Sequence, residues 1–88
     1  MKRKVFGAEL DTEISLLLSE TWDGWDKESF LYRDGNFRFF VFELEDTEND
    51  EGIPMKITSF RILDFDKAID FYFQCKEKHV VFDVAFKL

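Results

Sequence analysis

Two aromatic-rich segments, residues 29–33 and 36–44, flank the dipeptide Asp34-Gly35. Asp-Gly between such segments is typical of a type I′ turn, because both central residues of that turn take positive φ. The pattern therefore predicts a β-hairpin. Its second strand is apolar on both faces, with Phe37, Phe39 and Val41 in one phase and Phe40, Phe42 and Leu44 in the other. Such a strand is central with both faces covered, or it contributes to an interface between copies.

Regular spacing of apolar residues predicts two helices. The shorter begins after Asp11 or Thr12, either of which can cap it, and ends near Ser19 or Glu20. Its apolar residues recur at three- and four-residue spacing: Ile14, Leu17 and Leu18. The main helix is predicted over residues 65–77, with Asp64 as its N-cap. Its apolar face consists of Phe65, Ala68, Ile69, Tyr72 and Phe73.

Three further segments are predicted to be strands. Residues 2–6 precede a turn at Gly7-Ala8, and residues 55–63 follow Pro54 with a shift of phase that indicates a bulge. The tail alternates with period two, with Val80, Phe82, Val84, Phe86 and Leu88 on one side, which favours a strand, and the sequence alone does not decide between strand and helix for residues 79–88. We expect an α+β fold: a small, mostly antiparallel sheet with a central Asp-Gly hairpin, packed against one main helix and a shorter N-terminal helix.

The length of 88 residues predicts a single domain spanning residues 1–88. Apolar residues make up 45% of the chain and twelve residues are Phe, so a core can form without covalent cross-links. Cys75 is the only cysteine, which rules out an internal disulfide. The basic start of the chain is followed by Gly7 rather than by an apolar run, and no segment approaches the roughly 20 apolar residues that a bilayer requires. We expect a cytoplasmic protein that does not bind membranes.

The net charge is −7, from nineteen acidic and twelve basic residues. This charge disfavours direct binding to nucleic acid or anionic lipid and favours a partner protein with a basic surface. The net charge has an alternative explanation, because a small domain rich in apolar residues also needs charge to stay soluble. The net negative charge also counts against a role of Phe37-Arg38-Phe39 as a surface that stacks nucleic-acid bases.

The acids are concentrated in residues 43–51, where six of the nine residues are Asp or Glu. The segment lacks an apolar period and is predicted to be an exposed loop. A second loop places two large aromatics around Asp23-Gly24. The candidate partner-binding residues are Glu43, Glu45, Asp46, Glu48, Asp50, Glu51, Trp22 and Trp25. The acidic segment does not fit an EF-hand, because Glu51 stands where Gly is needed and Ile57 where a bidentate Glu is needed.

Little in the chain indicates catalysis. Cys75 and His79 would share a face only if the main helix continued to His79, and no oxyanion site is evident nearby. There is no nucleotide-binding glycine motif and no paired Cys or His spacing for zinc. We therefore expect a protein without catalytic residues, bound metal or cofactor.

Three segments carry a family resemblance: residues 4–13 (Lys4-Val5-Phe6-Gly7-Ala8-Glu9-Leu10-Asp11-Thr12-Glu13), residues 30–40 with the Leu31-Tyr32-Arg33 hairpin, and residues 62–69 with the capped helix. In this order they resemble small uncharacterised proteins encoded by phages and mobile elements of Gram-positive bacteria. Those proteins often have a Gly-rich stretch after the hairpin, whereas this chain has the acidic segment. The resemblance implies a mobile-element accessory protein and supplies no activity or site residues.

These observations lead to one main hypothesis and one alternative. The first is a non-enzymatic inhibitor or modulator that occupies a basic surface of a nucleic-acid-binding protein, as anti-CRISPR and toxin-immunity proteins do. The alternative is a structural module that self-associates, for example as a homodimer, through the second apolar face of residues 37–44.

Overall fold

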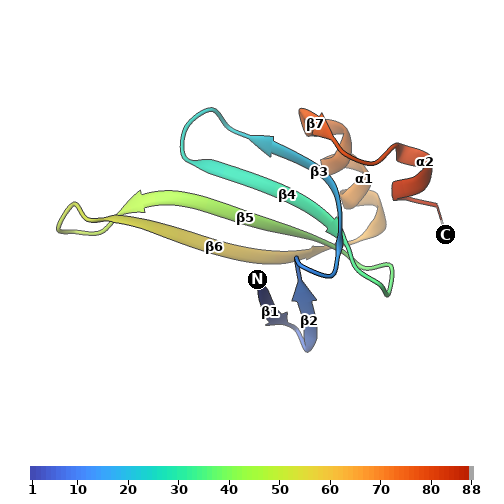
Figure 1. Cartoon of the computed structure of the whole chain (residues 1–88), viewed down its shortest axis with the longest axis horizontal. Coiled ribbons are helices and arrows are strands. Elements are labelled where there is room, and N and C mark those ends of the chain that lie inside the picture. Colours follow the sequence, from blue (N-terminus) through green and yellow to red (C-terminus); the bar gives the residue numbers. More distant parts are fainter. Residues whose placement is uncertain (88) are drawn as a thin grey trace.

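The centre of the fold is a five-stranded antiparallel sheet in the order β6-β5-β4-β3-β7, seen in a computed structural model that describes residues 1–87 (Figure 1). A separate two-stranded hairpin, β1-β2, precedes it. The elements are β1 (Lys2–Val5), β2 (Ala8–Asp11), β3 (Leu16–Trp22), β4 (Lys27–Arg33), β5 (Phe39–Glu48), β6 (Pro54–Leu63), α1 (Phe65–Gln74), β7 (Glu77–Lys78) and α2 (Phe82–Ala85). The predicted α+β class with a mostly antiparallel sheet is confirmed. None of the helices formed by residues 1–87 has the length and apolar character needed to cross a membrane.

One face of the sheet is covered by α1 and the C-terminal segment. Its buried cluster combines sheet residues Leu18, Leu31, Phe39 and Val41 with Ala68, Tyr72, Ala85 and Phe86 from the covering elements. The predicted N-cap of the main helix is confirmed, because the Asp64 carboxylate accepts a 2.8 Å hydrogen bond from the Lys67 amide. The helix ends at Gln74, three residues earlier than predicted.

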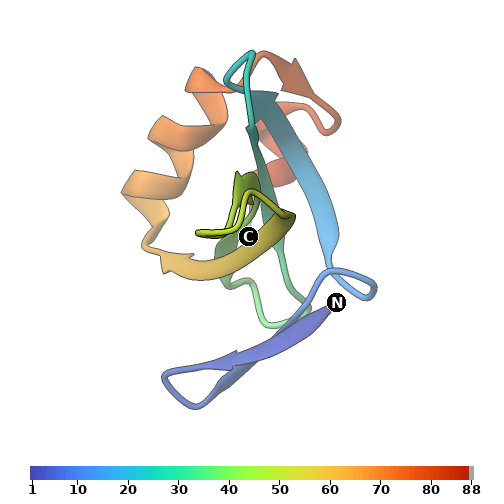
Figure 2. The same ribbon diagram turned by 90° about the vertical axis from the view of Figure 1, so that its left-hand side faces the viewer.

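The opposite face is covered by the β1-β2 hairpin. Leu10 is buried against Phe40, Phe42 and Phe60, and Arg3 lies over the Phe60 ring. The Arg3 guanidinium also donates hydrogen bonds to the Thr58 hydroxyl and carbonyl oxygens. Figure 2, which looks along the sheet, shows α1 and this hairpin on different sides of it. Of the two positions expected for the aromatic strand, the structure shows the central one, with both faces covered within one chain.

The predicted N-terminal helix is wrong, because residues 16–22 form strand β3. The pairing with β4 shifts register between Leu17 and Ser19, so Leu18 occupies a bulge. A bulge breaks the two-residue alternation of a strand, and here it leaves leucines at spacings that imitate a helix. Ile14, which the helix would have buried, is exposed.

The predicted C-terminal strand is also wrong. Only Glu77 and Lys78 pair with β3, and the chain then turns, so that residues 82–85 form the short helix α2. The turn is held in place because the Tyr72 hydroxyl donates a 2.6 Å hydrogen bond to the Val80 carbonyl. Ala85 and Phe86 are buried, whereas Val84 is exposed. Leu88, the last residue of the predicted strand, lies outside the described residues.

Two details of strands β4 to β6 differ from the predictions. The β4–β5 connection is a five-residue loop, residues 34–38, and not a two-residue type I′ turn. Asp34 carboxylate oxygen Oδ1 accepts hydrogen bonds from the amides of Asn36 and Arg38, and Phe37, not Gly35, takes the positive φ of 61°. In β6 the predicted bulge does not occur, because its pairing with β5 runs without a break from Leu63 to Pro54.

Candidate functional site

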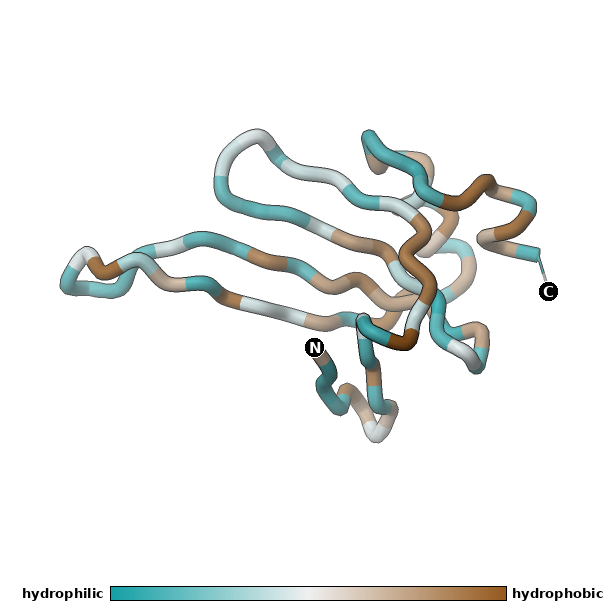
Figure 3. The backbone as a smooth tube through the Cα atoms, in the orientation of Figure 1, coloured by the Kyte–Doolittle hydropathy of each residue, from teal (hydrophilic) through white to brown (hydrophobic). Residues whose placement is uncertain are grey.

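Most of the residues predicted to bind a partner lie at one end of the sheet, in and around the β3–β4 connection and the outer part of the β5–β6 hairpin. We call this region the acidic end and define it as Trp22 at the end of β3, residues 23–26 of the β3–β4 connection and residues 45–53 of the β5–β6 hairpin. Figure 1 shows both loops at the same end of the sheet, away from β1, β2 and α2. A hydrogen bond of 2.8 Å from the Asp46 amide to the Asp26 carbonyl joins them directly. Figure 3 shows mostly hydrophilic and intermediate residues at this end, and the strongest hydrophobic colour toward the opposite end, around the start of β3 and the segment before α2.

The two tryptophans of the acidic end are exposed. The exposed fraction is 86% for Trp25 and 55% for Trp22. The Asp23 carboxylate accepts hydrogen bonds from the amides of Trp25, at 2.8 Å, and Lys27, at 3.2 Å. These bonds, first of all the one from Trp25, hold the pKa of Asp23 below its usual value of 3.8. The loop thus has internal hydrogen bonds that present Trp25 to solvent beside a carboxylate that stays charged.

The predicted acidic loop is mostly strand. Residues 43–48 belong to β5, and only residues 49–53 form the connection to β6. That connection repeats the geometry of the other hairpin loops, because the Asn49 side-chain oxygen accepts hydrogen bonds from the amides of Glu51 and Ile53. Gly52 takes the positive φ of 76° that the tight connection requires. The loop prediction rests on the missing apolar alternation. The outer part of β5 extends beyond the helix that covers the sheet, so acidic side chains can occupy a regular strand there.

Five of the six predicted acids are exposed, and Glu43 is not. The exposed five are Glu45, Asp46, Glu48, Asp50 and Glu51. The Glu43 side chain is only 14% exposed and contacts the ammonium of Lys27 and the guanidinium of Arg61. It also accepts a 2.8 Å hydrogen bond from the Ser29 hydroxyl. Glu43 therefore has a structural role within the sheet and is not available to a partner.

Cys75 and His79 do not form a pair. Cys75 is 2% exposed, and burial raises the pKa of its thiol above the ordinary value of 9.0, against the opposing influence of Ser19 and Lys78. The His79 imidazole instead points to β3, where its Nε2 lies 3.1 Å from a carboxylate oxygen of Glu20. A nucleophilic thiol needs a depressed pKa and an adjacent base, and Cys75 has neither.

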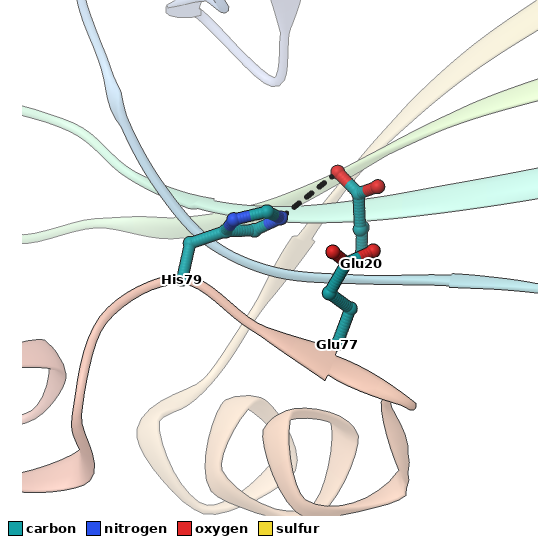
Figure 4. Close-up of side chains that lie close together, drawn as sticks. All are labelled: Glu20, Glu77 and His79. Atoms are coloured by element: carbon teal, nitrogen blue, oxygen red, sulfur yellow. Dashed lines mark ion pairs between the residues drawn. The ribbon is translucent and has the colours of Figure 1, made fainter.

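A second cluster of polar side chains was not predicted. Ligand atoms of Glu20, Glu77 and His79 all lie within 4.8 Å of one another (Figure 4). The cluster depends on the antiparallel pairing that sets Glu20 of β3 opposite Glu77 of β7. The spacing Glu77-x-His79 places both side chains on one face of an extended segment, but this signal is visible only once β7 is recognised as a strand.

Comparisons with protein-family models, with curated proteins and with solved structures gave no match to this chain.

Proposed function

We propose that this chain is a non-enzymatic binding protein whose acidic end docks on a basic surface of another protein. The observation that supports the proposal best is the hydrogen bond between Asp46 and Asp26, because it joins a tryptophan-bearing loop to an acidic strand at a free end of the sheet. Exposed carboxylates steer a basic partner during approach, and exposed aromatics supply the contacts that persist after docking.

The partner that fits this surface best is a nucleic-acid-binding protein. Side chains two residues apart in a strand share one face and lie about 7 Å from each other, so acids in such positions present spaced negative charges, as a nucleic-acid backbone does. Glu45, Asp46 and Glu48 lie on such a strand at the outer part of β5, and Asp50 and Glu51 continue the acidic surface around the tip. Occupying the basic surface would inhibit or modulate the partner, in the manner expected of a mobile-element accessory protein.

Self-association through the aromatic strand has less support. That alternative required an uncovered apolar face on residues 37–44. Phe40 is fully buried and Phe42 nearly so beneath the β1-β2 hairpin of the same chain. No second copy is needed to cover them.

The proposal is tested with two variants that carry the same change of charge. In the first, the exposed acids Glu45, Asp46, Glu48, Asp50 and Glu51 become Gln or Asn. In the control, five exposed acids elsewhere are changed in the same way: Glu9, Glu13, Asp66, Asp70 and Asp83. A partner is captured from a bacterial lysate with the parent protein, purified, and measured by surface plasmon resonance at several salt concentrations.

We expect the first variant to associate at least about tenfold more slowly at low salt, and the control to remain close to the parent. Both should fold, since exposed surface charges contribute little to stability. Nucleic acid bound by the partner should compete with the parent protein. Equal association rates for the parent and the first variant, or no competition by nucleic acid, would contradict the proposal.

A further inference from the structure

The side chains of Glu20, Glu77 and His79 converge at the β3–β7 edge of the sheet, on the opposite side of the strands from α1 (Figure 4). Backbone pairing, and not chance side-chain rotation, brings them together. Glu20 and Glu77 are directly paired residues in the antiparallel register. The His79 amide donates a 2.9 Å hydrogen bond to the Leu18 carbonyl, which continues the attachment to β3 beyond β7.

Two carboxylates directly opposite each other on neighbouring strands repel and destabilise the pairing. Among residues 1–87, neither Glu20 nor Glu77 has a Lys or Arg nitrogen within ion-pair distance, and the contact made by Glu20 is with His79. β7 is only two residues long, so few backbone hydrogen bonds offset this repulsion. A cation between the carboxylates would convert the repulsion into attraction.

The chemistry of the three groups indicates which cation. An imidazole nitrogen with two carboxylate oxygens suits zinc and similar transition-metal ions, whereas calcium and magnesium prefer oxygen ligands throughout. Zinc bonds to these atoms are about 2.0–2.2 Å long, so ligand atoms around one ion lie about 3.2–3.6 Å apart. The 3.1 Å between His79 Nε2 and the Glu20 oxygen is close to this spacing. Glu77 is exposed, so its side chain can rotate to complete the set.

Beside the cluster lies a hollow that gives room for water to occupy the remaining coordination positions. Its volume is about 180 Å³, and it is lined by Glu20, Thr21, Trp22, Glu28, Phe30, Lys76 and Glu77. Lys76, which also lines the hollow, is exposed and forms no ion pair with Glu20, Glu77 or any other acid within the described part of the chain.

We propose that Glu20, Glu77 and His79 form a binding site for one zinc-class divalent ion, which fastens the short edge strand β7 and the segment leading to α2 onto β3. None of the three ligands belongs to the acidic end, although the hollow beside them borders Trp22. Its role is structural, because it joins a strand early in the chain to a segment near its end.

The proposal is tested by titrating chelator-treated protein with Zn²⁺, and with Co²⁺ as a coloured substitute, by calorimetry and absorbance. We expect one ion per chain, with little response to Mg²⁺ at the same concentration. His79 is the only histidine, so its imidazole signals in NMR spectra are unambiguous and should move on addition of Zn²⁺. The amides of residues 77–80 should exchange with solvent more slowly when the ion is bound.

Variants separate this site from other possible ligands. His79→Ala and Glu77→Gln should each weaken Zn²⁺ binding at least about tenfold. Glu77→Gln guards against a folding artefact, because its side chain is exposed and the change is nearly isosteric. Glu28→Gln, which alters another carboxylate of the hollow, and Cys75→Ala, which removes the only thiol, should change the affinity less than about threefold. Absence of saturable Zn²⁺ binding, or binding that survives His79→Ala and Glu77→Gln unchanged, would overturn the proposal.

Discussion

The Asp46 amide nitrogen lies 2.8 Å from the Asp26 carbonyl oxygen and donates a hydrogen bond to it. The last regular pair of β4 and β5 is Lys27 with Glu45, so this bond extends the backbone contact one step into the β3–β4 connection. The loop that presents Trp25 is therefore fastened to the acidic strand. A fixed attachment between the two segments reduces the entropy that would be lost on binding a partner.

Removing the Trp25 side chain should affect binding and leave stability nearly unchanged. Trp25→Ala is expected to weaken binding to the captured partner by about 2 kcal/mol, as tryptophan anchors at interfaces do. The free energy of unfolding should change by less than about 0.5 kcal/mol, because the side chain packs against little of the protein. Phe6→Ala is the matched control, since Phe6 is 99% exposed on the distant β1-β2 turn. Equal losses of affinity in both variants would argue against a role for the acidic end.

Phe40→Ala should be severely destabilising. Phe40 is fully buried and stacks between Tyr32 and Phe60 in the core beneath the β1-β2 hairpin. Truncation of such a ring leaves a cavity and costs about 3–5 kcal/mol, measurable as a lower midpoint in urea denaturation. Phe73→Ala, at an exposed position of α1, should cost far less. A cost below about 1 kcal/mol for Phe40→Ala would mean that the hairpin does not cover this face in solution.

Two buried serines on neighbouring strands should respond to alanine in opposite directions. The Ser19 hydroxyl lies near the Cys75 thiol but makes no hydrogen bond of ordinary geometry. Ser19→Ala removes this unsatisfied group and should raise the free energy of unfolding by about 1 kcal/mol. Ser29 donates a hydrogen bond to Glu43, so Ser29→Ala should lower it by about the same amount. Denaturant unfolding of both variants measures the contrast, and a loss of stability in Ser19→Ala would contradict it.

Stability should decline at alkaline pH because of Cys75. Burial raises the pKa of its thiol in the folded state above the ordinary value of 9.0. As pH rises past that value, the unfolded chain loses the thiol proton first and binds fewer protons than the folded protein, so the free energy of unfolding falls. Cys75→Ala should flatten this decline between about pH 9 and 10 in urea denaturation at a series of pH values. An unchanged slope would exclude the thiol as its cause.

A second alkaline contribution should come from Tyr32. Burial, and to a smaller extent the Glu20 charge, raises the pKa of its phenol above 10.0, so its effect has the same sign and begins about one pH unit higher. Tyr32→Phe distinguishes it from the thiol, because this variant should keep the decline near pH 9 and reduce the one above pH 10.

The elements that could be predicted from the sequence are those whose signals are local. The Asp64 cap and the apolar spacing of α1 act within one helical turn. Gly7 marks the turn after β1, but the two turn residues are Phe6 and Gly7, both with positive φ, and not the predicted Gly7 and Ala8. The β3 strand could not be predicted, because the bulge at Leu18 is stabilised by pairing with β4 and hides the alternation. The tail alternates like a strand, but β7 continues for only two residues before Tyr72 holds the turn at Val80.

The same distinction applies to the candidate sites. Trp25 could be assigned to a loop from Asp23-Gly24, whereas Trp22, predicted in the same loop, is the last residue of β3. The exposure of five acids follows from their charge. Their proximity depends on the register of β4 and β5. The Glu20–His79 contact depends on pairing between segments far apart in the chain, for which a single sequence contains no signal.

The position of Leu10 beneath the sheet also sets an order of events during synthesis. Leu10 is buried against Phe40 and Phe60, which the ribosome adds much later. At translation rates of about 5–20 residues per second, about 3–10 seconds separate the synthesis of Leu10 from that of Phe60. During this interval the β1-β2 hairpin has no sheet to cover, and its apolar side is accessible to chaperones. The β1-β2 hairpin is thus synthesised well before the strands on which it packs.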